Sequence, residues 1–98
     1  MAKRRTDGNQ KEVVAALRKI GCSVFHTHKV GHGFVDIVCG FRGRNYLLEI
    51  KDGLQPPSRK KLTTDEKLFH FGWQGQVAIV YSAEDAVKYI QSKIYLEP

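Results

Sequence analysis

Asp36, Glu49 and Lys51 are the residues whose types and spacing could support chemistry. Glu49 and Lys51 are separated by one residue at the end of an apolar run, and Asp36 interrupts an earlier apolar run. Because alternate side chains of a strand share a face, Glu49 and Lys51 point the same way while Leu48 and Ile50 point into the core. The pattern therefore predicts one acidic and one basic side chain next to each other on a single strand face.

A hairpin is expected to bring Asp36 to the same face. Residues 42–43, Arg-Gly, have the composition of a two-residue turn between two strand-like runs. Counting back from that turn pairs Ile37 with Leu48 and Asp36 with Glu49. The two carboxylates then become cross-strand neighbours, so their charges repel each other unless a cation lies between them.

The predicted cation is Mg²⁺ or Mn²⁺, because both bind through one or two carboxylates together with water and substrate phosphate. Such an ion polarises a phosphate and lowers the pKa of a bound water. Lys51, beside Asp36 and Glu49 on the same predicted strand face, could orient that water or neutralise charge developing on phosphorus. The three residues thus predict metal-dependent phosphodiester hydrolysis, with Asp36 and Glu49 as metal ligands.

The elements that must position these residues follow from apolar periodicity, capping residues and turn residues. They predict a mixed α/β domain, with a small sheet flanked by helices and a C-terminal helix. The expected order is a helix over 9–20, strands over 23–28, 34–39 and 45–51, a loop over 52–61, a helix from the Thr63/Glu66 capping box to about Trp73, a strand over 76–81, and a last helix capped by Ser82 and Asp85, with Val87, Ile90 and Ile94 facing inward.

Size and composition fit one domain over residues 1–98, with a basic, flexible arm expected over residues 1–7. The two cysteines are too few for a disulfide framework, and no apolar segment follows the basic N-terminus as a secretory signal requires. No apolar run approaches the roughly 20 residues of a membrane span. These features predict a cytoplasmic protein.

Positive charge points to a polyanionic partner. Sixteen Lys and Arg against ten Asp and Glu give a formal net charge of +6, which favours encounter with nucleic acid. Clusters at residues 3–5 and 59–61 suit phosphate contact better than an even scatter does. The residues expected to contact nucleic acid are Arg59, Lys60, Lys61, Arg42, Arg44 and His32.

Residues 33–36, Gly-Phe-Val-Asp, and 46–53, Tyr-Leu-Leu-Glu-Ile-Lys-Asp-Gly, resemble the motif of the PD-(D/E)XK nuclease superfamily, in particular its small VRR-NUC-type domains of phages and bacteria. The resemblance implies a restriction-endonuclease-like αβββαβ core, Mg²⁺ or Mn²⁺ as cofactor, and Asp36, Glu49 and Lys51 as motif residues. It also implies the Ile50 carbonyl as a further metal ligand, and Glu12 as an acid on the first helix that helps to hold the metal or its water.

One departure from the motif is that Val35 stands where the name of the superfamily has proline. The substitution leaves the carboxylate of Asp36 in place and relaxes only the backbone before it. Free-standing domains of this type resemble homodimeric Holliday-junction resolvases. The resemblance therefore implies a homodimeric endonuclease acting on branched DNA in a bacterial or phage-infected host cell.

Other interpretations of the same residues stay open. A basic module could hold branched or single-stranded nucleic acid without cutting it, and RNA is a possible substrate. Three histidines, His26, His28 and His32, with Cys22 or Cys39 could also be interpreted as a zinc site, although their spacing does not match the usual finger patterns. Cys39 alternates onto the core side of its predicted strand, where a buried thiol is ordinarily a small hydrophobe.

Overall fold

The computed structural model describes residues 8–96, and the side chains of residues 8–93. The predicted basic arm over residues 1–7 lies outside the described residues, as does the side chain of Ile94. The elements are α1 (Gln10–Lys19), β1 (Ser23–His26), β2 (Ile37–Phe41), β3 (Arg44–Ile50), α2 (Pro57–Lys60), α3 (Thr64–Gly72), β4 (Val77–Val80) and α4 (Ala83–Leu96). The predicted α/β class and element order are confirmed, with α2 as one short helix inside the expected loop.

The four strands form one mixed sheet in the order β1-β2-β3-β4. The first two pairings are antiparallel and the β3–β4 pairing is parallel. Arg42 and Gly43 form the hairpin turn with φ values of 53° and 79°, which is the left-handed backbone that tight two-residue hairpins require. The register pairs Ile37 with Leu48, as predicted. Strand β2 begins later than expected, at Ile37.

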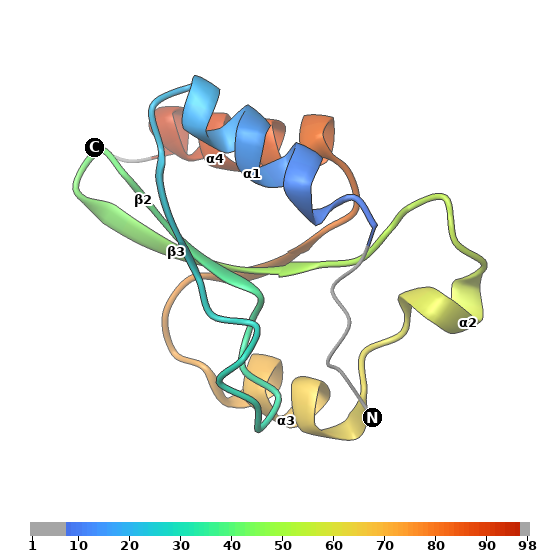
Figure 1. The fold of residues 1–98 in the computed structure, drawn as a ribbon. Helices are drawn as coiled ribbons and strands as arrows, with labels where there is room; N and C mark the ends of the chain where they lie inside the picture. The colour runs from blue at the N-terminus through green and yellow to red at the C-terminus, as the bar shows by residue number, and fades with distance from the viewer. Residues whose placement is uncertain (1–7, 97–98) are drawn as a thin grey trace.

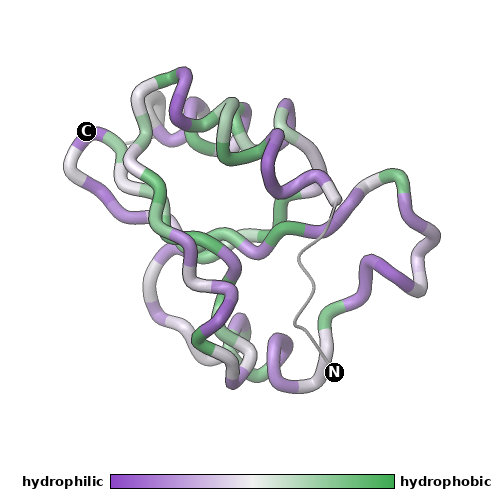
Figure 2. Tube along the Cα trace, viewed as in Figure 1, coloured by the Kyte–Doolittle hydropathy of each residue, from purple (hydrophilic) through white to green (hydrophobic). Residues whose placement is uncertain are grey.

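The sheet separates two different layers (Figure 1). Helices α1 and α4 lie together on one face, and α3 lies on the other. Strand side chains that point toward α1 and α4 are apolar and buried, and the central strands are largely hydrophobic in Figure 2. The core on this face includes Val13, Leu17, Ile37, Cys39, Tyr46, Leu48, Ile50, Val80 and Ile90. Because side chains alternate along a strand, Glu49 and Lys51 point to the α3 face.

Helix α3 begins with the predicted capping box. The Glu66 backbone N–H donates to Thr63 Oγ1 at 3.1 Å, and the Thr63 backbone N–H donates to Glu66 Oε1 at 2.9 Å. These contacts satisfy two backbone donors that a helix start leaves without partners. The expected cap of α4 is present as well, because the Asp85 backbone N–H donates to Ser82 Oγ at 3.0 Å. Among its predicted inward residues, Ile90 is fully buried and Val87 is half-buried.

The loop before β2 holds α3 against the sheet. Gly33 has a φ of +79°, and a Cβ at this position would lie 2.3 Å from the Asp65 backbone oxygen. Only glycine allows both this conformation and this approach. The Phe34 and Phe69 rings meet edge to face at 5.0 Å between centroids. Loop and helix are therefore fixed together beside Asp36. Within residues 8–96, no helix is long and apolar enough to cross a membrane.

Candidate active site

Asp36 is held rigidly at the start of β2. Its Oδ2 accepts the Ile50 backbone N–H at 2.7 Å, and its backbone carbonyl accepts the Thr27 N–H at 2.8 Å. The Thr27 hydroxyl in turn donates to the Val35 carbonyl at 2.8 Å. Asp36 is 8% exposed. Its carboxylate therefore has one oxygen committed to β3 and lies beside Glu49, as the predicted register requires.

Glu49 is a carboxyl group buried next to another carboxyl group. It is 2% exposed, and its Oε2 lies 3.8 Å from Lys51 Nζ. Burial raises the pKa of Glu49 to about 10, with further contributions from the negative charges of Asp36 and Glu66, and Lys51 opposes the rise only in part. Among the described residues, no group hydrogen-bonds Glu49 Oε1. A buried oxygen of this kind is unfavourable unless a proton or a cation satisfies it.

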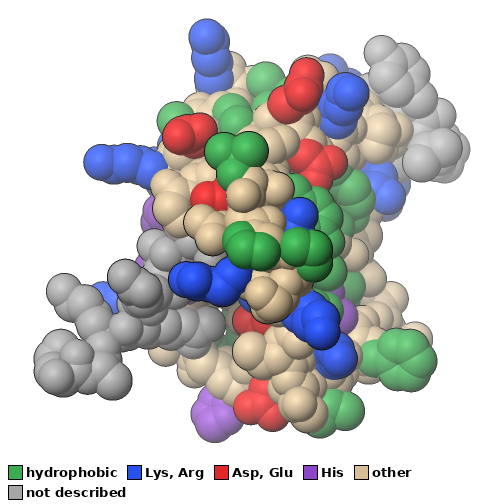
Figure 3. Space-filling view, turned by 90° about the vertical axis from the view of Figure 1, so that its right-hand side faces the viewer, with side chains coloured by type: hydrophobic (Ala, Val, Ile, Leu, Met, Phe, Trp, Pro, Cys, Tyr) green, Lys and Arg blue, Asp and Glu red, His purple; other side chains and the backbone are tan. Residues whose placement is uncertain are grey.

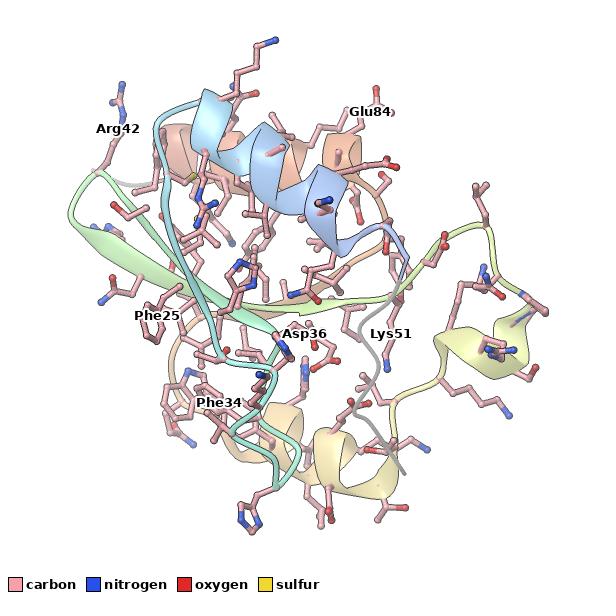
Figure 4. All side chains as sticks on the ribbon, in the orientation of Figure 1. Phe25, Phe34, Asp36, Arg42, Lys51 and Glu84 are labelled. Atoms are coloured by element: carbon pink, nitrogen blue, oxygen red, sulfur yellow. The ribbon has the colours of Figure 1, made fainter. Side chains whose placement is uncertain are left out.

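Lys51 lies between Glu49 on the sheet and Glu66 on α3. Its Nζ donates to Glu66 Oε1 at 3.1 Å, so one α3 carboxylate serves both the capping box and this lysine. Burial by itself raises the pKa of Glu66, but the hydrogen bonds from the Thr63 backbone and Lys51 outweigh burial and leave that pKa lowered. Figure 4 shows Asp36 and Lys51 close to the middle of the molecule, above α3. Glu66 is therefore an ionised partner of Lys51.

Helix α3 supplies a second residue, His70. Its Nε2 lies 3.9 Å from Glu49 Oε1, and its side chain is 13% exposed. Burial lowers the pKa of His70, so that the neutral imidazole is favoured. Sequence reasoning did not assign His70 or Glu66 to the site, although their spacing of four residues places both on one face of a helix.

Glu12 is exposed on α1. No hydrogen bond or ion pair given for the described residues joins it to Asp36, Glu49 or Lys51. The N-terminal end of α1 does reach β3, because Asn9 Nδ2 donates to the Lys51 carbonyl at 3.3 Å and to the Tyr81 carbonyl at 3.1 Å. The structure therefore brings Asn9, and not Glu12, into contact with the strand that carries the motif.

The donors suit a hard divalent cation. Within the described part of the chain, no group of three or more His, Cys, Asp or Glu side chains is gathered to hold a metal. A cation here would therefore draw on Asp36 and Glu49, with water, phosphate and the predicted Ile50 carbonyl completing its shell, as Mg²⁺ and Mn²⁺ sites commonly do. The buried Glu49 Oε1, without a hydrogen-bond partner, is the atom that such a cation would satisfy. The residues present thus fit the predicted cofactor.

The predicted basic residues fall into two separate places. Lys60 and Lys61 line an open groove of about 400 Å³ with Gly53, Pro57 and Tyr81. Arg59 is exposed on α2 beside it. Figure 3 shows the side of the molecule on which α2 projects, and Lys and Arg side chains stand out over the middle of that side. Gly53 follows Lys51 by two residues, so this groove begins just after the end of β3.

Arg42 and Arg44 lie at the other end of the hairpin, as Figure 4 shows for Arg42. Seven residues of β3 separate that end from Lys51, which corresponds to roughly 23 Å at 3.3 Å per residue. His32 is exposed in the loop that contacts the start of α3. The basic residues at 59–61 therefore lie near the segment that follows Lys51, whereas the two arginines lie at the far end of β3.

The residues of the alternative zinc interpretation do not form one metal-binding group within the described part of the chain. Cys22 and Cys39 are buried and free, and both belong to the apolar core. His26 Nδ1 lies 3.2 Å from Gln10 Nε2 of α1, on the opposite side of the sheet from α3, and the His26 and His28 rings meet edge to face at 6.0 Å between centroids. Cys39 points to the core as expected.

Comparison with known proteins leaves the site to be interpreted from its own geometry. No protein-family model matches the chain, and no curated protein or solved structure matches it. The chain is an α/β protein with a small mixed four-stranded sheet flanked by helices and a C-terminal helix. What this arrangement can do follows from the carboxylates, the lysine and the adjoining basic groove.

Proposed function

We propose that this chain is a metal-dependent nuclease that hydrolyses DNA phosphodiester bonds. The observation that carries the proposal is the buried pair Asp36 and Glu49, with Lys51 Nζ 3.8 Å from Glu49. A protein that buries two adjacent carboxyl groups loses stability unless a proton or a cation compensates for them. The helix, three strands, helix and strand that hold them match the αβββαβ order of the restriction-endonuclease-like fold, to which we assign the chain within the PD-(D/E)XK superfamily.

Each residue has a separate role in this proposal. Asp36 and Glu49 would hold the Mg²⁺ or Mn²⁺ ion, which would supply an activated water and polarise the scissile phosphate. Lys51 places its ammonium group beside that position, where it orients the water and neutralises charge that develops on the phosphate oxygens. Asp36 is already positioned by the Ile50 N–H, so the ligand geometry costs little to form when the ion binds.

The basic groove next to the site orients the substrate. Lys60 and Lys61 contribute two ammonium groups along the path that leaves the end of β3. Phosphate contacts of this type fix the position of a duplex without reading its sequence. A structure-selective enzyme needs that property, so we propose branched DNA such as a Holliday junction as the substrate and a homodimer as the acting form.

The test uses a labelled four-way junction, a linear duplex of the same sequence and an RNA duplex, each incubated with the protein in Mg²⁺, Mn²⁺ or EDTA. We expect metal-dependent cutting of the junction, at least about a hundredfold slower in Lys51→Ala and Asp36→Asn. Lys11→Ala, which removes the same charge from an exposed position on α1, serves as the control and should cut normally. Glu12→Gln shows whether the α1 acid participates.

Two outcomes would count against the proposal. Tight binding without cutting of any substrate in either metal would identify a nucleic-acid-binding module instead. Cutting that persists in Asp36→Asn would place the active site elsewhere. Asp36→Asn should retain its DNA affinity within a fewfold, and light scattering that shows only monomers at high concentration would exclude paired cutting by a homodimer.

A further inference from the structure

Two buried polar atoms face each other between the sheet and α3, and neither has a hydrogen-bond partner among the described residues. The two atoms are Glu49 Oε1 and His70 Nε2, and 3.9 Å separates them. This distance is too long for a hydrogen bond. Leaving two buried polar atoms without hydrogen bonds is unfavourable. Something else is therefore expected to bind between them.

The distance between these two atoms is one that a single ion can bridge. Metal–oxygen and metal–nitrogen bonds to carboxylate and imidazole are about 2.0–2.2 Å and 2.0–2.1 Å long. Their sum exceeds the 3.9 Å between Glu49 Oε1 and His70 Nε2, so both atoms reach a common ion with a bent angle at the metal. From these distances we infer that His70 Nε2 is a ligand of the same ion that Glu49 binds.

The spacing of α3 and β3 explains why the two residues meet. Glu66 and His70 are one helical turn apart, about 6 Å along the axis. Lys51 and Glu49 are two strand residues apart, about 6.6 Å. The helix can therefore place Glu66 on Lys51 at 3.1 Å and His70 on Glu49 at 3.9 Å simultaneously. Helix α3 thus provides one partner for each functional residue of β3.

An imidazole ligand changes which ion the site prefers. Carboxylate and water suit Mg²⁺, whereas imidazole suits first-row transition ions. An ion held by Glu49 and His70 together is therefore expected to be Mn²⁺ in preference to Mg²⁺. The inference rests on the proposed function in one respect, namely that Asp36 and Glu49 hold the ion.

The test measures Mn²⁺ binding to the full chain by electron paramagnetic resonance, with MnCl₂ alone and no nucleic acid. Pulsed measurements detect nitrogen nuclei bound to Mn²⁺, so we expect a histidine nitrogen signal in the wild type. His70→Asn should lose that signal and bind Mn²⁺ at least about tenfold more weakly, which is the low end of the effect of losing even an outer-shell partner. His32→Asn, an exposed histidine in a loop, should keep both.

A wild type that binds Mn²⁺ without a nitrogen signal overturns the inference even if His70→Asn fails to fold. A nitrogen signal that His70→Asn retains also overturns it. These results are distinguishable from failure of the nuclease proposal. A nitrogen signal lost in His70→Asn, in a protein that cuts no substrate, supports the ligand and contradicts the activity. Metal-dependent cutting without a nitrogen signal does the reverse.

Discussion

The two faces of the sheet differ in what they bury. Toward α1 and α4, strand side chains such as Ile37, Leu48 and Ile50 are apolar and almost completely buried. Toward α3, the same strands bury Asp36 and Glu49, with Lys51 beside them. The first face stabilises the fold through apolar burial, whereas the second retains groups whose burial is unfavourable. The comparison indicates that α3 covers the polar face of the sheet, which carries the proposed site, and that α1 and α4 complete the core.

Leu48 tests the apolar face most strongly. It is completely buried, so Leu48→Ala removes apolar contacts and leaves a cavity. We expect the free energy of unfolding to fall by about 2–5 kcal/mol, measured by urea denaturation. Leu54→Ala makes the same chemical change at a position that is 96% exposed, and it should stay within about 0.5 kcal/mol of the wild type. Equal effects of the two would contradict the assignment of the core.

Gly33 tests the attachment of α3 to the other face. Alanine here meets a positive φ, which costs roughly 1–2 kcal/mol, and the Asp65 backbone, which adds roughly 1–3 kcal/mol. Gly31 has a φ of +81° with nothing within 4 Å of a Cβ. Gly31→Ala therefore measures the conformational cost alone, and Gly33→Ala should be the more destabilising in urea unfolding. If the two variants lose equal stability, the close approach of loop and helix contributes nothing.

The sequence predicted the strand faces of the site because these depend on local patterns. Alternation along 45–51 and the Arg-Gly turn were sufficient to place Glu49 and Lys51 together and to pair Ile37 with Leu48. Glu66 was predicted only as a capping residue, and His70 was not assigned a role. Which face of a helix docks on a sheet depends on contacts between distant residues, here Gly33 and Phe34 against α3.

The dependence on contacts between distant residues also explains two predictions that were less accurate, the start of β2 and the position of Arg42. Strand β2 begins at Ile37, directly after Asp36, whose carboxylate accepts the Ile50 N–H. Such side-chain contacts have no periodic signature. Arg42 and the basic residues at 59–61 were likewise all expected to contact nucleic acid, although the hairpin places Arg42 at the end of β3 far from the others.

Glu49 provides a pH test of the charged face. Because its pKa is raised from 4.5 to about 10, the folded state binds more protons than the unfolded state between these values. Without metal, stability should therefore decrease as pH rises through this range. Glu49→Gln should weaken that dependence and raise the free energy of unfolding at pH 8 in EDTA by about 1 kcal/mol. Thermal unfolding at pH 5 and pH 8 measures both effects.

Added metal should reverse the order of stability of the wild type and Glu49→Gln. Mn²⁺ binds the folded state and is expected to stabilise the wild type by mass action, with little effect on Glu49→Gln. A wild-type stability that is flat from pH 5 to pH 8 in EDTA would show that Glu49 is not held protonated. It would also remove the energetic difference between the two faces.

Glu66 allows the smallest and most specific test, because its two contacts can be separated. Glutamine can still complete a capping box, so Glu66→Gln should keep the start of α3 while removing the negative charge 3.1 Å from Lys51 Nζ. Freed from that charge, Lys51 should attract phosphate more strongly, and DNA affinity should rise by about two- to fivefold, as expected for a partly screened ion pair. Fluorescence anisotropy at two salt concentrations measures the change.

Thr63→Ala is the matched control, since it removes the cap and leaves the charge of Glu66. It should lower the free energy of unfolding by about 1 kcal/mol without raising DNA affinity. If Thr63→Ala tightens DNA binding as much as Glu66→Gln does, looser docking of α3 is the cause. If only Glu66→Gln does so, the negative charge of Glu66 directly weakens the attraction of Lys51 for phosphate. DNA affinity at the polar face then depends on electrostatic interactions with α3, whereas the stability of the apolar face depends on packing.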